Sequence, residues 1–451
     1  MMKQDTIAAI ATAPGTGGIG IIRISGPEAE QVLSRVFCPS GGRQAVSPET
    51  HRMVYGFLKD GDETIDECMA VFMRAPRSYT REDVAEIHLH GGTYVTNRGL
   101  EICLRAGARL AEAGEFTRRA FLNGRIDLSR AEAVMNMIAA RGEQERRAAI
   151  RQLQGGASSF IRGISDNLYD LQAGLSACMD YPEEISDEEG TSHLREGLQS
   201  LILKLKEAID EHASRLIHQG LETTLAGRPN VGKSSILNSL LGEERAIVTD
   251  IPGTTRDTVR GELVLNGIRI LITDTAGIRY TNDPVEKIGV ERSEKAMREA
   301  DLTLIVLDGS EPLQETDREL LCGLCGKGAA VINKTDLPAA FSPDIIHEIR
   351  PDLECILVSV VSPEGLGPLR DYLSRFARVN DNLELTQPRH LDAAGRAVRH
   401  LEEALETLEE HTPDMAATDL QAAQAALSEI TGDQADEMLM DRVFSRFCVG
   451  K

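Results

Sequence analysis

The sequence predicts α/β and α domains: an N-terminal α+β domain, a helical domain, and an α/β domain with a mostly parallel sheet inserted into the helical one. Three patterns predict this architecture. Apolar runs of strand length recur in residues 1–120. Apolar residues at helical spacing recur in residues 125–219 and after residue 385. Between them, over residues 221–376, strand and helix patterns alternate. A chain of 451 residues also exceeds what one compact core usually holds.

The composition predicts a soluble protein of a reducing compartment. The hydrophobic share of 41% and the charged share of 27% are ordinary for globular proteins. No apolar run approaches the roughly 18 residues that span a bilayer, and Met1–Ala13 lacks the apolar core of a secretory signal. The eight scattered cysteines fit free thiols. We therefore expect a cytoplasmic protein with no membrane association.

The net charge of −22 is unevenly distributed. Residues 1–150 hold 19 basic and 19 acidic side chains, whereas residues 401–451 hold three basic and twelve acidic ones. A nucleic-acid-binding protein usually has a basic excess, because phosphate contacts supply most of its affinity. Binding of RNA would therefore need a local basic surface, for which the candidates are Arg118, Arg119, Arg125, Arg130, Arg146 and Arg147.

The N-terminal and helical regions show different periodicities. Ile19–Ile24 and Ala85–Leu89 are strand-length runs within the expected domain 1–120. The expected helical domain covers 121–219 and 380–451. Its helical spacings are seen in Leu168, Leu171, Leu175 and Cys178, less strictly in Leu201, Leu203, Leu205 and Ile209, and in the segments Leu420–Ile430 and Glu437–Phe447. The acidic segment Asp180–Gly190 is expected to be a solvated loop.

The expected inserted domain, 220–379, alternates strand and helix patterns, as parallel sheets with crossover helices do. Its predicted strands are Thr223–Ala226, Arg269–Thr273, Leu302–Leu307, Ala329–Ile332 and Ile356–Ser359.

A phosphate-binding loop lies between the first of these strands and the predicted helix Ser235–Leu241. Gly227 to Ser234 reads GRPNVGKS and fits the pattern G-x-x-x-x-G-K-[ST]. Backbone N–H groups of such a loop surround the phosphates. Lys233 would neutralise the β- and γ-phosphate oxygens, and the Ser234 hydroxyl would bind Mg²⁺.

Three further motifs follow in sequence order. Gly253–Asp257 (GTTRD) supplies Thr255 for Mg²⁺ and the γ-phosphate, and Asp274–Gly277 (DTAG) follows an apolar run. Asn333–Asp336 (NKTD) supplies a carboxylate that can accept the N1 and N2 protons of guanine, which adenine lacks. The Ser359–Val360 backbone would contact guanine O6. Together the motifs predict a Ras-like P-loop GTPase domain that binds GTP.

The glutamine that orients the attacking water in Ras-type enzymes is missing, because Ile278 occupies that position. Glu286 could take over this catalytic role. A helix-capping role for Glu286 is at least as compatible with its local sequence.

The flanking sequences resemble one family. The resemblance rests on the segments Asp5–Gly15, Gly20–Gly26, Ser78–Thr80, Glu82–His88, His90–Gly92, Gly114–Thr117, Arg119–Gly124, Asp127–Leu128 and the C-terminal Phe447–Lys451 (FCVGK). Over essentially the whole chain the sequence resembles the tRNA wobble-uridine modification GTPases of the MnmE (TrmE) family.

This resemblance implies a homodimer whose N-terminal domain binds 5-formyltetrahydrofolate or a related folate through Arg23, Glu86, Arg125 and Lys451. It implies a heterotetramer with a FAD-containing flavoprotein of the MnmG (GidA) type. Together they would add an aminomethyl or carboxymethylaminomethyl group to C5 of the wobble uridine of certain tRNAs. It also implies that G domains pair across the dimer and that Glu286 positions the water.

Metal and nucleotide ligands follow from the same resemblance. K⁺ would be bound by Asn230, Thr249, Ile251 and Thr254, and Mg²⁺ by Ser234 and Thr255. The residues expected to contact GTP are Asn230, Val231, Gly232, Lys233, Ser234, Ser235, Thr249, Asp250, Ile251, Pro252, Gly253, Thr254, Thr255, Asp274, Thr275, Ala276, Gly277, Asn333, Lys334, Asp336, Ser359 and Val360.

Alternative interpretations remain for the roles of the cysteines and for the function of the chain. Cys448 is either inert or has a role in modification, and Cys322 and Cys325 are expected to be packing residues without zinc. The alternative function is a GTP-dependent switch or ribosome-assembly G protein with no modification chemistry. A membrane-remodelling GTPase has no lipid-binding stretch to support it.

Overall fold

The computed structural model describes residues 5–41, 49–180, 187–243, 259–274, 297–362, 364–380, 383–410 and 413–450. The chain forms two compact units. The first comprises Met1–Met135, Gln152–Ile202 and Arg396–Lys451, and the second comprises Asn136–Arg151 and Leu203–Gly395. In the described part of the chain, no helix is long and apolar enough to cross a membrane.

The first unit contains a seven-stranded sheet in the order β3-β4-β5-β6-β2-β1-β7. Neighbouring strands are antiparallel except β1 and β7, which are parallel. The strands are β1 (Ile7–Ile10), β2 (Ile19–Ser25), β3 (Phe37–Pro39), β4 (Met53–Asp60), β5 (Glu63–Met73), β6 (Val84–His90) and β7 (Arg109–Leu110). The predicted strands in β2 and β6 are confirmed.

The two faces of this sheet differ because side chains alternate along each strand. Ile22 and Ile24 of β2 pack in one core with α1 (Ala29–Val36) and α2 (Thr93–Arg105). Arg23 points to the opposite face, where its cross-strand partner is Glu86. The helices therefore cover one face and leave polar and apolar side chains on the other.

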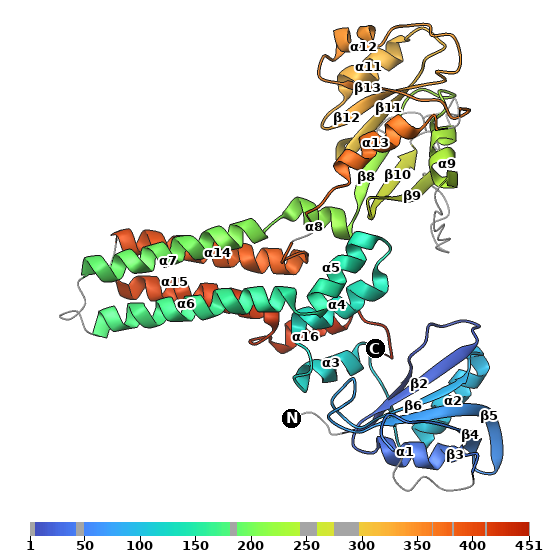
Figure 1. Ribbon diagram of the computed structural model, residues 1–451, viewed down its shortest axis with the longest axis vertical. Helices are drawn as coiled ribbons and strands as arrows, with labels where there is room; N and C mark the ends of the chain where they lie inside the picture. Colours follow the sequence, from blue (N-terminus) through green and yellow to red (C-terminus); the bar gives the residue numbers. More distant parts are fainter. Residues whose placement is uncertain are drawn as a thin grey trace, which may run out of the picture. The chain divides into compact units, whose positions relative to one another are not determined.

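Helices form the rest of the first unit. They are α3 (Glu115–Leu122), α4 (Leu128–Ala139), α6 (Gly156–Asp180), α7 (Asp187–Ala208), α14 (Pro388–Glu410), α15 (Pro413–Thr431) and α16 (Glu437–Phe444). Three of them, α4, α7 and α14, also include residues assigned to the second unit. Helices α6, α7, α14 and α15 run side by side (Figure 1). Leu168, Leu171 and Leu175 are buried as their spacing predicts. Leu203 is exposed, because the buried leucines of α7, Leu198, Leu201 and Leu205, recur every three or four residues on the opposite face.

Three predicted boundaries are wrong. Helix α6 runs through Asp180 and α7 begins at Asp187, so the acidic loop is shorter than Asp180–Gly190. Helix α16 ends at Phe444 instead of Phe447, and the Phe447 ring packs against the Phe444 ring at a centroid distance of 5.4 Å. Strand β13 ends at Leu357 and not at Ser359.

The C-terminal tail packs against the N-terminal domain within the first unit. Val449 forms an antiparallel bridge with Ala113, and the N–H of Gly114 donates to the carbonyl of Cys448 at 3.4 Å. Val449 also lines a cavity of about 590 Å³ formed mainly by Thr12–Gly17 and the start of α2. This packing positions Cys448 at the surface, where it is exposed.

The second unit contains a six-stranded sheet in the order β13-β12-β11-β8-β10-β9. All neighbours are parallel except β9 and β10, which confirms the predicted mostly parallel sheet. The strands are β8 (Leu221–Ala226), β9 (Val259–Leu265), β10 (Ile268–Asp274), β11 (Leu302–Asp308), β12 (Gly328–Asn333) and β13 (Glu354–Leu357). The helices are α5 (Glu143–Leu153), α8 (Glu211–His218), α9 (Lys233–Glu243), α11 (Glu315–Gly323), α12 (Asp344–Ile349) and α13 (Gly367–Phe376).

Helices cover both faces of this sheet. Alternate residues of β11 enter two different cores: Leu304 and Val306 pack with α9 and α13, whereas Ile305 and Leu307 pack with α11 and α12. All seven residues of β11 are buried, as is typical of parallel sheets with two covered faces. Because β8, β10, β11 and β12 are parallel, their carboxyl ends meet at one edge, and predicted motifs lie at the ends of β8, β10 and β12.

Candidate nucleotide-binding site

The phosphate-binding loop connects β8 to α9, and its backbone requires glycine at both ends. Gly227 and Gly232 have φ angles of 147° and 101°, in the left-handed region that side chains disfavour. A Cβ atom at Gly232 would lie 2.2 Å from Nδ2 of Asn333, and one at Gly227 would lie 2.4 Å from the Val306 carbonyl oxygen. Asn230 also has a positive φ, 66°, which asparagine tolerates better than most residues.

Lys233 opens helix α9, and its side chain is buried against the loop. Its Nζ donates to the carbonyl oxygens of Gly227 and Arg228, both at 2.6 Å. Burial lowers the pKa of this ammonium group, and the nearby Asp274 carboxylate opposes that effect. The arrangement holds a poorly solvated cation at the N-terminus of a helix, where anions such as phosphate are stabilised.

Ser234 and Asp274 bring together the two oxygen groups that P-loop proteins use around Mg²⁺. The Ser234 hydroxyl donates to Oδ2 of Asp274 at 2.6 Å. Asp274 is the last residue of β10 and is 1% exposed. A hydroxyl and a carboxylate oxygen are hard ligands, so this pair suits Mg²⁺, and binding would replace their mutual hydrogen bond.

The loop after β12 is tied to the phosphate-binding loop. Asn333 Nδ2 donates to the Val231 carbonyl at 2.9 Å, and this bond is buried. The Thr335 N–H and hydroxyl both donate to the carbonyl of Val358, at 3.2 and 3.0 Å. These bonds join the predicted base-binding and phosphate-binding segments into one structure.

Asp336 is held by the segment that follows β13. The Ser359 hydroxyl donates to Oδ1 of Asp336 at 2.5 Å, and Ser359 is buried. Val360, expected to contact GTP through its backbone, has a side chain that packs against the sheet core. The structure thus brings Asp336 and Ser359 together at the edge where their motifs were predicted to meet.

Sequence reasoning missed Asp308, which lies at the end of β11. It forms an ion pair with Lys334, and its Oδ1 accepts hydrogen bonds from the hydroxyl and N–H of Ser310. Burial alone would raise the pKa of the Asp308 carboxyl, but the bonds from Lys334 and Ser310 bring it below its usual value. Asp308 directly follows the apolar run Leu302–Leu307, as Asn333 follows Ala329–Ile332, so the same sequence signal could have identified it.

A second contact that the sequence did not predict stabilises the phosphate-binding loop. Arg228 Nε lies 2.9 Å from both carboxylate oxygens of Asp317, and the Asp317 side chain is buried. Asp317 also completes the capping box of α11 with Gln314. Nothing in the local sequence pairs residues 228 and 317, because only the folded sheet brings them together.

In the first unit, two of the residues predicted to bind folate, Arg23 and Arg125, converge on the ring of Tyr79. Arg23 Nε donates to Oε1 of Glu86 at 2.8 Å. The guanidinium carbons of Arg23 and Arg125 lie 5.4 and 4.7 Å from the centroid of the Tyr79 ring. The Tyr79 hydroxyl is hydrogen-bonded to Thr117 at 2.9 Å. Two guanidinium groups, a carboxylate and an aromatic face are therefore available to one ligand.

Comparison with known proteins identifies the family. The family models described as "GTP-binding protein TrmE N-terminus" and "MnmE helical domain" match residues 6–125 and 128–448. The tRNA modification GTPases MnmE of Heliobacterium modesticaldum and Symbiobacterium thermophilum are 43% and 44% identical, with full coverage of both chains. That of Bacillus subtilis is 41% identical over 99% of this chain and its own full length.

The chain belongs to the MnmE family of tRNA modification GTPases. It is therefore a GTP hydrolase, and the resemblance inferred from the flanking motifs is confirmed. Among solved structures, Aquifex aeolicus Era bound to GDP and aluminium fluoride is 27% identical and covers 40% of this chain and 66% of its own. Its TM-score of 0.29 is too low to establish a shared fold.

Several residues predicted from the MnmE pattern lie outside the described residues. They are Thr249, Asp250, Ile251, Pro252, Gly253, Thr254, Thr255, Thr275, Ala276, Gly277, Glu286 and Lys451. Among the four predicted K⁺ ligands, Asn230 alone is described, and it is exposed. Ser235 is described and follows Ser234 in the first turn of α9.

The basic surface considered for RNA binding is partly neutralised. The Arg119 side chain is 7% exposed and forms ion pairs with Asp5, Glu82 and Glu115, so it cannot contribute to that surface. Arg146 and Arg147 are half-exposed, but both pair with Glu143.

The expected packing role of Cys322 and Cys325 is wrong, since both thiols are exposed. Leu321 and Leu324 fill the core at this end of α11 instead. Helix α11 ends at Gly323 and Leu324 is extended, so Cys325 lies beyond the helix, where its thiol is exposed.

Proposed function

We propose that this chain is a K⁺-dependent GTPase that, with a FAD-containing flavoprotein of the MnmG (GidA) type, adds an aminomethyl or carboxymethylaminomethyl group to C5 of the wobble uridine of certain tRNAs. The observation that carries the proposal is the match to MnmE proteins along both complete chains. The division into an N-terminal domain (1–120), a helical domain (121–219 and 380–451) and an inserted G domain (220–379) is part of this proposal.

In the proposed site, Asp336 accepts the N1 and N2 protons of guanine, and Lys233 moves from the loop carbonyls to the phosphates. The short bond from Ser359 supports this assignment, because it fixes one carboxylate oxygen before the base arrives. Asn333 Oδ1 is buried without a hydrogen-bond partner among the described residues, which also favours a polar ligand here. Ser234, with Thr255, would hold Mg²⁺, which would neutralise phosphate charge as GTP is cleaved.

The proposed catalytic arrangement uses K⁺ and Glu286 in place of the Ras-type glutamine and arginine finger. Asn230, with Thr249, Ile251 and Thr254, would hold K⁺ beside the phosphates. The exposed position of Asn230 at the loop, with its positive φ, supports a role in ligand binding over one in packing. Glu286 would orient the attacking water.

The proposed folate site lies around Tyr79. Arg23 and Arg125 would bind the carboxylates of 5-formyltetrahydrofolate, and Glu86 would accept hydrogen bonds from its pterin ring, with Lys451 as an additional cation. The convergence of Arg23 and Arg125 on one aromatic ring supports the assignment, because a flat conjugated ring can stack between guanidinium and tyrosine planes.

The proposed homodimer forms through the uncovered face of the N-terminal sheet. Met53, Tyr55 and Met69 are each more than 40% exposed on adjacent strands, and Tyr55 lies directly opposite Met69. On β6 the neighbour of Met69 is the polar residue His88, so the apolar strip ends there. An exposed strip of this kind on a sheet face favours a second copy of the chain as its partner. Tyr55→Asp should then shift the mass measured by light scattering from dimer to monomer.

Recognition of tRNA is proposed to depend on the flavoprotein partner as well as on this chain, since the chain is acidic and Arg119 is buried. A tRNA substrate and eight free cysteines fit a cytoplasmic location. Cys448 is proposed as an accessible thiol that could assist modification, because its backbone is bonded to Gly114 while the residue stays exposed.

Reconstitution tests the whole proposal. The chain, the flavoprotein with FAD and NADH, undermodified tRNA, a one-carbon folate, an amine donor (ammonium or glycine) and GTP are incubated with K⁺, and digested nucleosides are analysed by mass spectrometry. The expected result is a wobble uridine with the added C5 group, formed only when GTP and both proteins are present. GTP hydrolysis without any new nucleoside would contradict the modification role and support the alternative, a GTP-dependent switch.

A further inference from the structure

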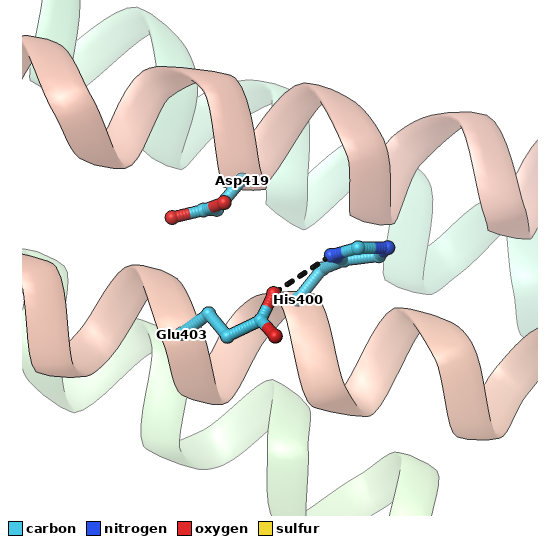
Figure 2. A group of neighbouring side chains, drawn as sticks. All are labelled: His400, Glu403 and Asp419. Atoms are coloured by element: carbon cyan, nitrogen blue, oxygen red, sulfur yellow. Dashed lines mark hydrogen bonds and ion pairs between the residues drawn. The ribbon is translucent and has the colours of Figure 1, made fainter.

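Three side chains capable of binding a metal meet on the surface of the helical hairpin formed by α14 and α15. His400 and Glu403 come from α14, and Asp419 comes from α15 (Figure 2). Each offers one nitrogen or oxygen atom, and the three atoms all lie within 4.8 Å of one another. Within the described ranges of this chain, no other group of three His, Cys, Asp or Glu side chains meets the same condition.

The hairpin fixes this arrangement through its core. Helix α15 starts three residues after α14 ends, so the two helices are neighbours along much of their length. Ala404 and Leu408 of α14 and Ala416 and Leu420 of α15 are buried. His400 and Glu403 are three residues apart and lie on the same face of α14. Asp419, next to the buried Leu420, faces them from the adjacent helix.

Contacts within the group orient the side chains. His400 Nδ1 lies 2.9 Å from Oε2 of Glu403. The Thr407 hydroxyl donates to the Glu403 carbonyl at 2.8 Å and lies 3.5 Å from Oδ2 of Asp419. His400 and Asp419 are only partly exposed, so part of the ordering is already present in the fold. A pre-ordered donor set loses less entropy when an ion binds.

The electrostatic surroundings favour a cation. Among the described residues, neither Glu403 nor Asp419 has an ion pair with a lysine or arginine. Arg396, one turn before His400, is bonded instead to Glu429 at 3.1 and 2.6 Å. The chain from 401 to 451 contains twelve acidic and three basic residues. Two carboxylates therefore lie together in an acidic region without a compensating side-chain cation.

We propose that His400, Glu403 and Asp419 bind a divalent transition-metal ion, with Zn²⁺ as the favoured ion. An imidazole nitrogen with two carboxylate oxygens suits Zn²⁺ better than Mg²⁺ or Ca²⁺, which prefer oxygen ligands alone. Bond lengths of about 2.0–2.2 Å in tetrahedral geometry put ligand atoms about 3.4 Å apart. Since the three atoms lie within 4.8 Å of one another, no pair has to close by more than roughly 1.4 Å, which rotation of the side chains on fixed helices can supply. Water would complete the coordination, and the ion would link α14 to α15.

The test uses the full-length chain, first stripped with EDTA and then titrated with Zn²⁺ by isothermal calorimetry. The variants His400→Ala and Asp419→Asn each remove one ligand. Glu402→Gln is the matched control, because it removes one negative charge from the same helix without removing a ligand. Circular dichroism and GTP turnover verify that each variant is folded.

The expected result is one Zn²⁺ site in the wild-type chain and in Glu402→Gln. Each ligand variant should lower the affinity of this site by about 100-fold or more, since loss of even an outer-shell partner costs roughly 10- to 100-fold. Zn²⁺ should also raise the midpoint of thermal unfolding in the wild-type chain and not in His400→Ala. Co²⁺ bound at this site should lack the intense charge-transfer absorption of thiolate coordination. Equal Zn²⁺ affinity and stoichiometry in the wild-type chain and both ligand variants would overturn the proposal.

Discussion

Replacing Asp336 with asparagine should change which nucleotide the chain binds. The carboxylate would accept two hydrogen bonds from guanine, and hydrogen bonds to a charged group contribute about 1.5–3 kcal/mol each. Asparagine keeps one acceptor oxygen and loses the other, which costs about 1.5–3 kcal/mol. Each 1.4 kcal/mol is tenfold, so GTP affinity should fall by roughly 10- to 100-fold. Ser359 fixes the side chain through its 2.5 Å bond, which leaves the substituted amide in place to donate to the C2 carbonyl of xanthine.

The assay is equilibrium binding of fluorescent GTP and XTP to the wild-type chain and to Asp336→Asn. XTP affinity should rise in the variant as GTP affinity falls. The matched control is Asp344→Asn, which makes the same charge change at an exposed carboxylate bonded to Ser342, away from the predicted base contact. The reasoning is refuted if Asp336→Asn binds GTP as tightly as the wild-type chain does.

Three further outcomes are expected. Glu286→Ala should lower GTP turnover by about 100-fold or more while leaving GTP affinity unchanged, as expected for a group that positions the attacking water; unchanged turnover in K⁺ would exclude this role. Gly232→Ala should abolish measurable nucleotide binding, because its Cβ would lie 2.2 Å from Asn333 Nδ2 at a φ of 101°; binding within threefold of wild type would contradict the loop geometry. Burial raises the pKa of the Cys68 and Cys103 thiols to about 12. Alkylation at pH 8 should therefore modify these two thiols only after denaturation, whereas the exposed thiols should react in the folded chain. Peptide mass spectrometry identifies which cysteines are modified in each state.

The sequence predicted the central strands β8, β11 and β12 of the inserted sheet well because they are buried on both faces, whereas it missed the edge strand β9. A run such as Leu302–Leu307 is apolar except at Thr303, so its pattern stands out from the alternating surface segments around it. The phosphate-binding loop was equally visible, since its glycines are required by local backbone geometry at Gly227 and Gly232. Strand ends were less certain, as β13 shows, because pairing with β12 stops at Leu357.

Features that depend on distant contacts could not be predicted. The pairing of Arg228 with Asp317 and the convergence of Arg23 and Arg125 on Tyr79 require the tertiary fold. The order of the N-terminal sheet is also non-local, because β1 and β2 are separated from β7 by more than 80 residues. For Cys322 and Cys325 the sequence predicted a packing role that the fold does not give them, because the neighbouring leucines occupy the core.

GTP turnover of the purified chain in K⁺ and in Na⁺ at equal ionic strength tests the central claim most directly. Turnover should be at least about 100-fold faster in K⁺, comparable to the effect of one transition-state charge stabiliser, and Asn230→Ala should remove the difference. Equal rates in the two salts would contradict the K⁺-dependent mechanism and leave a GTPase that positions its water and stabilises its phosphates by other means.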